Sequence, residues 1–445
     1  MSSKIPQEPT RATIDHLTPA GLGIANVGGR RTRIANGLPG EEVEFRYLRR
    51  HRGGDDGIAV RIMANSHPER VTPCCPHTGY CGGCSLQHLE HGAQVRLHQA
   101  HLEECLAAVG GPTRWLSPIT DNAIHGYRRK ARLGVKFVDK RDTVLVGFRE
   151  RARSLVAEIE SCAVLHPAVG ERILELRTLI YSLDARHAIP QIEVAVGEEE
   201  VALIFRHIAP LSAQDQARLI AFASEKSSRL RIFLQPAGLD TITPLWPKSS
   251  SSLIYRLPLY EITIAFRPTD FTQVNLAVNR AMVEQAISLL EPQPGEAVLD
   301  LYCGLGNFSL PLARCQARVT GVEGDAGLVT RARENARDHA LEVEFFVHDL
   351  NQGLPMELLR ANNAHGFPYS KALLDPPRSG AAAVLPDLAA LEIARIVYVS
   401  CNPETLSRDA IDLVRRHGYH LEAAGVIDMF PHTGHMESMA IFFAG

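Results

Sequence analysis

Hydrophobic and polar positions change their rhythm along the chain and divide it into three regions. Residues 8–68 carry short alternating runs, such as Val43-Glu44-Phe45-Arg46-Tyr47, separated by glycine turns at Gly28-Gly29 and Pro39-Gly40. Alternation over a few residues, broken by turns at close spacing, is typical of short strands with one buried face. The pattern predicts a small β-barrel over residues 8–68.

Residues 69–265 contain both the period of about 3.6 residues that is typical of helices and the alternation that is typical of strands, and they predict an α+β region. The apolar spacing indicates helices over 94–109 and 167–183, and strands over 131–138, 144–148 and 155–159. Two further strands, 192–196 and 201–205, flank Gly197-Glu198-Glu199 and predict a hairpin. From residue 266 to residue 445, apolar strands alternate with helical stretches. That order predicts a parallel sheet covered by helices, so the whole chain falls in the α/β class.

Composition narrows the class of protein. A length of 445 residues allows two to four domains, and 45% hydrophobic with 22% charged residues excludes disorder as the main state. The net charge of −3 excludes a globally basic nucleic-acid binder, but not local basic patches. No apolar run reaches the roughly 18 residues of a membrane span, and the first residues lack the apolar core of a signal peptide. We therefore expect a cytoplasmic protein without a membrane partner.

Nine cysteines in a reducing compartment point to metal binding or catalysis rather than to disulfides. Cys75, Cys81 and Cys84 have the spacing C-x5-C-x2-C, and Cys162 lies far downstream. Four thiolates hold either zinc or an iron–sulfur cluster, and the spacing alone does not choose between them. Cys74 is an ambiguous neighbour of this set.

A glycine-rich turn indicates a nucleotide-type site. The apolar strand Val298–Tyr302 runs into Cys303-Gly304-Leu305-Gly306-Asn307-Phe308, where small residues let the backbone approach a ligand. The next strand ends in Glu323, about 20 residues later, which suits the two hydroxyls of a ribose. This spacing fits dinucleotide enzymes as well as S-adenosylmethionine (SAM) methyltransferases.

Two later strands favour methyl transfer. Leu374 is followed by Asp375-Pro376-Pro377-Arg378, and Val399 by Ser400-Cys401-Asn402-Pro403. Strands of one parallel sheet end at the same edge, so a carboxylate and a thiol should converge beside the glycine turn. A thiol nucleophile is not needed for hydride transfer, but it suits methylation of an unreactive carbon.

At this point the sequence resembles the RNA 5-methyluridine methyltransferase family over nearly its whole length. The likeness rests on five motifs in family order: Phe271–Asn275, Asp300–Phe308, Leu374–Arg378, Ser400–Pro403 and Phe430–Glu437. It implies an OB-like TRAM barrel at 8–68, a central iron–sulfur domain at 69–265, and a Rossmann-like class I SAM methyltransferase domain at 266–445.

The resemblance also implies roles for individual residues. Cys401 is the expected nucleophile toward C6 of uracil, Glu437 the general base, and Asp375 the group where cofactor and substrate meet. His432 and His435 are less favoured alternatives for the base. The residues expected at SAM are Gln273, Tyr302, Asn307, Glu323, Asp349 and Asp375, with Asn351 a competitor of Asp349. For Cys75, Cys81, Cys84 and Cys162 it implies a [4Fe-4S] cluster.

RNA is the expected partner. Seven arginines gather within the predicted barrel, and they suit either a solvated loop or a face that binds phosphates: Arg30, Arg31, Arg33, Arg46, Arg49, Arg50 and Arg52. Phe271 is a candidate for stacking on an unpaired uracil or for the core. Together, the cysteine set and the TRAM-like region favour the family members that methylate one uridine of 23S ribosomal RNA, as a monomer. The alternatives are another ribosomal uridine, transfer RNA, or a non-enzymatic RNA-binding iron–sulfur protein.

Overall fold

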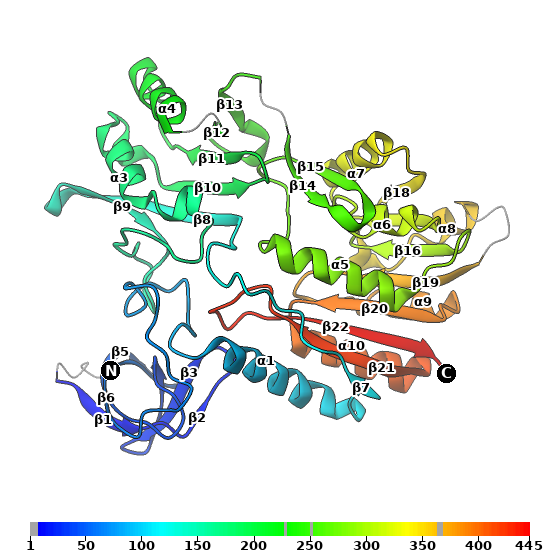
Figure 1. Cartoon of the computed structure of the whole chain (residues 1–445), viewed down its shortest axis with the longest axis horizontal. Coiled ribbons are helices and arrows are strands. Elements are labelled where there is room, and N and C mark those ends of the chain that lie inside the picture. Colours follow the sequence, from blue (N-terminus) through cyan, green and yellow to red (C-terminus); the bar gives the residue numbers. More distant parts are fainter. Residues whose placement is uncertain (1–7, 227–228, 250–251, 363–367) are drawn as a thin grey trace.

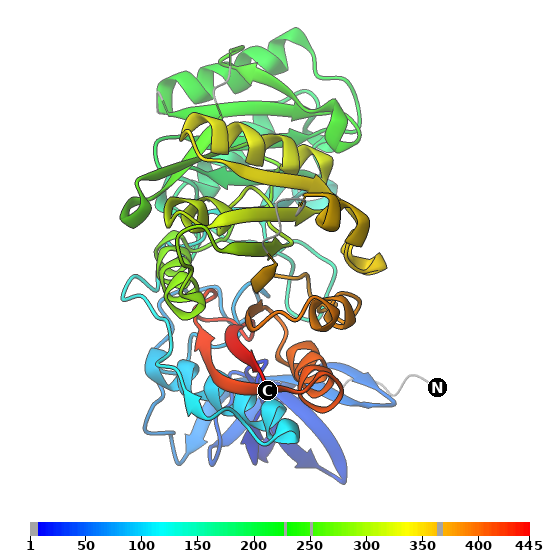
Figure 2. The same cartoon turned by 90° about the vertical axis from the view of Figure 1, so that its right-hand side faces the viewer.

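A computed structural model describes residues 8–226, 229–249, 252–362 and 368–445 of the chain. Its strands form three large sheets and a separate hairpin (Figure 1). These sheets follow the three regions predicted from the sequence. In both Figure 1 and Figure 2 the central sheet lies at the top and the N-terminal sheet at the bottom, and in Figure 1 the C-terminal sheet lies to the right of both. No helix in the described ranges is both long and apolar enough to cross a membrane.

The N-terminal sheet has the order β1-β5-β6-β4-β3-β2. Its two outer strands are consecutive in the chain, so the sheet curls back on itself into the barrel-like body of Figure 1. Gly28 and Gly29 both have positive φ and form the tight turn between β3 and β4. The strands are β1 Thr10–Thr13, β2 His16–Leu17, β3 Leu22–Val27, β4 Arg30–Ala35, β5 Glu42–His51 and β6 Gly54–Ala64.

The central sheet has the order β13-β12-β11-β10-β8-β9, and only β11 and β12 pair in parallel. The predicted hairpin is confirmed, with Val196 opposite Val201. Helices α3 and α4 pack on this sheet over an apolar core. The elements are β8 Lys130–Val138, β9 Thr143–Gly147, α2 Pro167–Gly170, α3 Ile173–Ser182, β10 Gln191–Val196, β11 Val201–Arg206, α4 Ala213–Lys226, β12 Leu230–Gln235 and β13 Thr243–Trp246.

The C-terminal sheet has the order β18-β17-β16-β19-β20-β22-β21-β7, with β18 to β20 parallel and β22 antiparallel. The chain starts at β16, builds outward to β18, and then returns to β19 on the other side. This reversal leaves a crevice at the carboxyl ends of β16 and β19. The strands are β16 Ala297–Leu301, β17 Arg318–Glu323, β18 Val343–Val347, β19 Tyr369–Leu374, β20 Arg395–Ser400, β21 Tyr419–Ile427 and β22 Glu437–Ala444.

Helices cover both faces of the C-terminal sheet, as the alternating pattern predicts. The hairpin of β14 Leu253–Leu257 and β15 Ile262–Phe266 packs against α7, where Asn335 accepts from the Ala265 N–H at 2.9 Å. The helices are α5 Leu276–Leu290, α6 Ser309–Arg314, α7 Ala326–Asp338, α8 Met356–Asn362, α9 Leu385–Ala390 and α10 Pro403–His417.

One segment of the predicted central region lies against the C-terminal sheet. Helix α1 His91–Leu106 places Leu102 and Leu106, both fully buried, in the same apolar core as α10 and β21. Strand β7 Arg114–Trp115 then extends the sheet itself by pairing with β21. The chain thus crosses from the cysteine-rich segment, residues 74–84, to the C-terminal core and back to the central sheet.

Two local predictions are wrong. Residues 155–159 do not form a strand, and only Val156 makes an isolated bridge to Arg149. Its apolar residues Ala157 and Ile159 are nevertheless buried, so the run marks core packing in irregular backbone. The helix predicted over 167–183 is broken into α2 and α3 near Arg172, whose non-helical backbone caps α3.

Short 3-10 turns occupy Ala107–Val109, Asp139–Arg141, Arg186–Ala188, Leu239–Thr241, Pro258–Tyr260 and Leu350–Gln352.

Candidate active site

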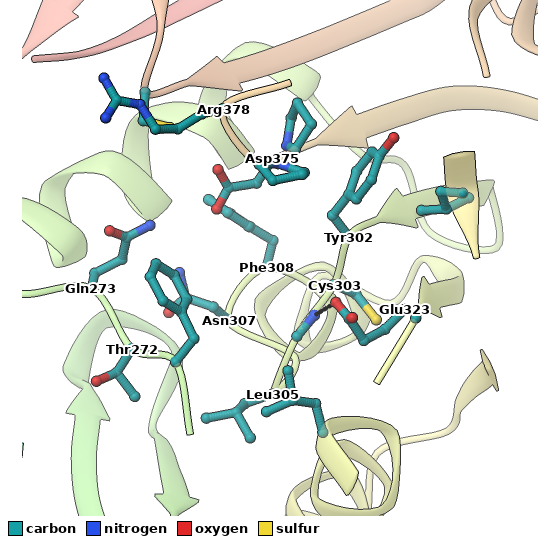
Figure 3. Close-up of a pocket in the computed structure, with 18 of the residues that line it drawn as sticks. Thr272, Gln273, Tyr302, Cys303, Leu305, Asn307, Phe308, Glu323, Asp375 and Arg378 are labelled. Carbon is teal, nitrogen blue, oxygen red and sulfur yellow. Dashed lines mark hydrogen bonds between the residues drawn. The ribbon is translucent and has the colours of Figure 1, made fainter. Parts of the chain in front are cut away.

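A cavity of about 550 Å³ opens at the carboxyl ends of β16, β17 and β19. The favoured cofactor and catalytic residues from the sequence all line it: Gln273, Tyr302, Asn307, Glu323, Asp349, Asp375, Cys401 and Glu437. Figure 3 shows several of them converging from the glycine turn, from β19 and from the segment before α5. His432 and His435 are not among the lining residues, so the two alternative bases lie outside this cavity.

The glycine turn after β16 is held open by backbone geometry. Tyr302 adopts a left-handed φ of 62°, as do Gly304 at 53° and Gly306 at 88°. Such values cost a non-glycine residue free energy, and their occurrence at a ligand cavity is typical of functional turns. The Gly304 N–H donates to Glu323 Oε2 at 3.2 Å, and the Asp325 N–H donates to Oε1 at 2.9 Å. Glu323 is therefore oriented at the tip of β17, beside the turn (Figure 3).

Asn307 is fixed by partners from two other elements. Its amide pairs with that of Asn279 on α5, at 3.0 and 3.1 Å. The Tyr255 hydroxyl donates to Asn307 Oδ1 at 2.9 Å. Tyr255, which also lines the cavity, has no motif signal in the sequence and was missed there. Tyr255 and Asn307 are more than fifty residues apart in the chain, so only the tertiary structure shows that they are in contact.

Asp349 and Asn351 both line the cavity, so the structure keeps both as candidates for the adenine end. The Asp349 carboxylate accepts from the Asn351 N–H at 3.0 Å, from the Asn351 amide at 2.8 Å and from Gln352 at 3.2 Å. These hydrogen bonds lower the pKa of Asp349. The two residues are thus one ordered turn rather than independent alternatives.

Gln273 and Asp375 face each other across the cavity (Figure 3). Gln273 precedes α5 by three residues, and Asn275 caps that helix by accepting from the Val278 N–H. Phe271, two residues earlier, is 70% exposed at the cavity. Exposure on this scale excludes the core role for Phe271 and leaves a stacking surface.

Two carboxyl groups and one thiol make up the reactive corner of the cavity. Burial raises the pKa of Asp375, and hydrogen bonding from Gln273 offsets part of that rise. Burial and the nearby charge of Asp375 raise the pKa of Glu437, which is 4% exposed and whose Oε2 has no hydrogen-bond partner within the described ranges. Because two like charges at close range oppose one another, the pair holds a proton near neutral pH.

The Cys401 thiol is held in its protonated form by the same surroundings. Burial, then Glu437 and Asp375, raise its pKa to about 11, and Arg378 acts in the opposite direction. Arg378 lines the cavity beside Asp375 (Figure 3) and is a residue whose role the sequence did not single out. The sequence feature that could have indicated this role is the position of Arg378 directly after Asp375-Pro376-Pro377. A positive charge added to this corner would favour the thiolate.

The four predicted thiols line a second, much smaller cavity in the cysteine-rich segment. Cys75, Cys81, Cys84 and Cys162 surround about 20 Å³ together with apolar Phe148 and Ile159. Burial raises the pKa of Cys81 to about 11 and of Cys84 to about 12. Thiols with pKa values this high stay protonated near neutral pH, and they become thiolate ligands when a cation binds and displaces the proton. The donor set therefore fits a thiolate-bound metal centre.

The arginines of the N-terminal sheet divide into two groups. Asp55 pairs with Arg30 at 3.0 Å and with Arg50 at 3.2 Å, while Arg33 pairs with Asp56 at 2.7 Å. These three side chains tie the sheet together. The remaining four are exposed and form no ion pair within the part of the chain that the structure describes: Arg31, Arg46, Arg49 and Arg52.

Comparisons with known proteins agree with this fold and site. A family model for tRNA (uracil-5-)-methyltransferases matches residues 255–443. The chain is 49% identical to the 23S rRNA (uracil(1939)-C5)-methyltransferase RlmD of Nitrosococcus oceani, over 98% of this chain and 96% of that one. It is also 49% identical to the RlmD of Alkalilimnicola ehrlichii, over 99% and 97%.

Among solved structures, the tRNA (uracil-54, C5)-methyltransferase of Pyrococcus abyssi, in complex with S-adenosyl-L-homocysteine, superposes with a TM-score of 0.74 at 24% identity. The match covers 97% of this chain and 99% of that one, and it establishes the shared fold. The protein is thus of the SAM-dependent RNA uracil-C5 methyltransferase class. Within that class, the chain belongs to the RlmD family.

Proposed function

We propose that this protein methylates C5 of one uridine in 23S ribosomal RNA, the uridine numbered 1939 in the names of its relatives. The observation that supports this most directly is the convergence of Cys401, Asp375 and Glu437 on one cavity beside the glycine turn. We further propose that it acts as a cytoplasmic monomer.

The proposed cofactor is SAM, which would supply an activated methyl group. Glu323 is oriented to accept hydrogen bonds from the ribose hydroxyls, because the Gly304 and Asp325 N–H groups hold both of its oxygens. Asp349 and Asn351 would contact the adenine, and Tyr302, Asn307 and Gln273 would line the remainder of the site. The positive sulfonium of SAM would face the carboxylate corner.

Uracil C5 is a weak nucleophile, and the proposed role of Cys401 is to activate it. The Cys401 thiolate adds to C6, forming an S–C6 bond and moving the electrons of the C5–C6 double bond toward C5 and O4. C5 would then take the methyl group that SAM supplies, and the electron pair of the broken sulfur–methyl bond would stay with the cofactor's sulfur. Glu437 removes the proton left on C5, the S–C6 bond breaks, and the thiolate leaves with the electron pair.

Charge balance explains how a thiol with a raised pKa becomes reactive. Cys401 is opposed by Glu437 and Asp375 and assisted by Arg378. A bound sulfonium adds a second positive charge to the corner, which favours both the thiolate and ionised Glu437. Nucleophile and base would then be prepared only when the methyl donor is present.

The uracil must leave the stack to reach Cys401, because C6 is not accessible inside a helix. Phe271, exposed at the cavity, is positioned to stack on the extruded base. The exposed arginines of the N-terminal TRAM-like sheet would contact the phosphates.

For Cys75, Cys81, Cys84 and Cys162 we propose a [4Fe-4S] cluster, supported by the family resemblance and by the four thiols that line one apolar cavity. Its proposed role is structural.

The test is transfer of a labelled methyl group from SAM to unmodified transcripts of 23S ribosomal RNA and of transfer RNA, followed by mapping of the product. We expect one modified uridine in 23S RNA, and none with Cys401→Ala. Cys315→Ala changes a cysteine that does not line the cavity; it is the matched control and should keep full activity. Methylation of transfer RNA alone would contradict the proposed 23S RNA substrate but would agree with the proposed methylation of uridine C5. Absence of transfer to either RNA, with cofactor binding intact, would favour a binding protein.

A further inference from the structure

A second group of metal-binding side chains lies outside both sites described above. Cys74, His125 and His432 come from three separate segments, and one ligand atom of each lies within 4.8 Å of the others. The Cys74 sulfur is 3.0 Å from His125 Nε2, and the rings of His125 and His432 are 5.2 Å apart. Cys74 and His125 are exposed, whereas His432 is 5% exposed.

His432 is held in place from both sides of its backbone. Its N–H donates to Gln94 Oε1 at 2.8 Å, and its carbonyl accepts from the Ser85 and Leu86 N–H groups, both at 2.9 Å. Its φ of 69° lies in the left-handed region, which is costly for a side chain of this size. Strain of this kind persists where the surroundings impose it, so the imidazole is presented in a set position.

The imidazole of His432 also lacks a complete set of partners. Nδ1 lies 3.3 Å from the Gln94 amide nitrogen, whose protons already serve the Leu86 and Leu89 carbonyls at 3.2 and 2.8 Å. Among the residues that the structure describes, Nε2 is buried with no hydrogen-bond partner of full geometry, and the ring interacts with the backbone of Ile124. A buried ring nitrogen without a partner costs free energy, and a metal ion would satisfy it.

Cys74 is distinct from the four thiols of the cysteine-rich cavity. It does not line that cavity, although its neighbour Cys75 does. Its sulfur lies 3.0 Å from His125 Nε2, and its thiol donates to the side-chain Oε1 of Gln87 at 3.4 Å. Cys74 and His125 line a neighbouring cavity of about 290 Å³, which Cys75 and Cys162 also line and His432 does not.

We propose that Cys74, His125 and His432 form a binding site for a borderline-soft divalent cation, of which Zn²⁺ is the best match. One thiolate and two imidazoles are ligands that zinc prefers, and the exposure of two of them leaves a fourth position for water. Bond lengths of about 2.3 Å to sulfur and 2.0–2.1 Å to nitrogen require a sulfur–nitrogen separation near 3.5 Å. His125, on an exposed segment, has to retreat by about 0.5 Å from its present hydrogen bond. Binding releases the Cys74 thiol proton to solvent.

The site would join the cysteine-rich segment to the segment that carries Glu437. His432 lies five residues before Glu437, and the contacts of Gln94, Ser85 and Leu86 with His432 already link the two segments. An ion at this place adds a bridge that the unfolded chain lacks, so it would raise the free energy of unfolding by an amount that grows with the logarithm of the free ion concentration above its dissociation constant.

The test is elemental analysis and Zn²⁺ titration of the full chain after its iron content has been brought to saturation, so that the four cavity thiols are occupied. We expect one zinc per chain. Cys74→Ser and His125→Gln should each weaken zinc binding at least tenfold, as measured by competition with a chromophoric chelator, while iron content stays unchanged. Cys315→Ser is the control and should bind zinc like the parent protein.

Cobalt provides an independent measurement. Co²⁺ bound at this site should give a sulfur-to-cobalt charge-transfer band that disappears in Cys74→Ser and persists in Cys315→Ser. Because both substituted side chains are exposed, the variants should fold, and circular dichroism checks this. Zinc binding that is unaffected by Cys74→Ser and by His125→Gln would overturn the proposal. The contact between Cys74 and His125 would then be only a hydrogen bond.

Discussion

At the scale of single residues, the active-site cavity is governed by three groups whose charges oppose one another. Glu437 and Asp375 raise the pKa of Cys401, and each carboxyl is itself shifted upward by burial. All three cannot be anionic together in a cavity of this size. The protonation state of each one is therefore set by the other two and by Arg378.

Glu437→Gln tests this coupling. Removing one negative charge beside Cys401 favours its thiolate, so the pH midpoint for alkylation of Cys401 by iodoacetamide should fall. In the presence of SAM and RNA, the same variant lacks the proposed base and should accumulate a covalent protein–RNA adduct, visible on a denaturing gel. Glu404→Gln, which is not among the groups that shift Cys401, should change neither. An unchanged alkylation midpoint in Glu437→Gln would contradict the coupling.

At the scale of elements, α1 is the helix whose position is least evident from its place in the chain. It follows the cysteine-rich segment, yet its apolar face packs on the core formed by α10, β21 and β22. Arg415 on α10 donates to the Ala108 carbonyl, just beyond the end of α1, at 2.6 Å. A defect in α1 should therefore be felt in the C-terminal sheet.

Leu102→Ala is the corresponding prediction. Leu102 is fully buried, so truncation leaves a cavity and should lower the free energy of unfolding by about 2–5 kcal/mol. Urea unfolding followed by the fluorescence or circular dichroism of the chain measures it. Glu104→Ala, on the exposed face of the same helix, should change stability by less than about 0.5 kcal/mol. Equal effects of the two substitutions would show that α1 does not contribute to the core.

At the scale of the whole molecule, one buried ion pair connects the N-terminal sheet to the cysteine-rich segment. Arg70 donates to both oxygens of Glu41, at 2.5 and 2.6 Å, and to the Asn36 carbonyl at 2.8 Å. Burial opposes ionisation of Glu41, but Arg70 and the backbone N–H groups of His67 and Leu38 outweigh it and lower the pKa of Glu41.

Arg70→Met should therefore destabilise the protein in a pH-dependent way. At pH 7 it leaves a buried carboxylate unpaired, which costs about 3–5 kcal/mol. A carboxyl with a lowered pKa stabilises the fold above its unfolded pKa, and this contribution is lost as pH falls through the folded pKa. The difference between variant and parent in urea unfolding should thus shrink below pH 4. Arg132→Met removes an arginine whose side chain is 68% exposed beside Glu193, and it should cost less than about 1 kcal/mol.

The distribution of arginines on the N-terminal sheet predicts how RNA binding responds to salt. Arg46 and Arg49 are exposed, and each phosphate contact contributes about 0.7 to the slope of log affinity against log salt for single-stranded RNA. Arg46→Gln with Arg49→Gln should lower that slope by about 1.4, as measured by filter binding at several salt concentrations. Arg337→Gln with Arg360→Gln, on the distant helices α7 and α8, is the control. An unchanged slope would exclude this face from RNA contact.

Much of the architecture follows from local pattern. Alternation predicts the N-terminal strands and the β10–β11 hairpin, because one face of each strand is buried and the period of a strand is two. The ends of β16, β17, β19 and β20 were predictable for a similar reason: apolar runs stop where polar or glycine residues begin. Pattern failed at residues 155–159, since buried apolar residues in irregular backbone have the same composition as a strand.

The sequence by itself determined the types of chemical group at the site and the edge of the sheet where they meet, because parallel strands all end on one side. Only the tertiary structure decided which groups are in contact. Tyr255 orients Asn307, α1 joins the C-terminal core, and His432 lies beside Cys74 rather than at the cavity. These contacts join residues far apart in the chain, and local periodicity carries no information about such pairs. Burial, and with it the shifted pKa values of Cys401, Asp375 and Glu437, likewise arises only when the segments pack together.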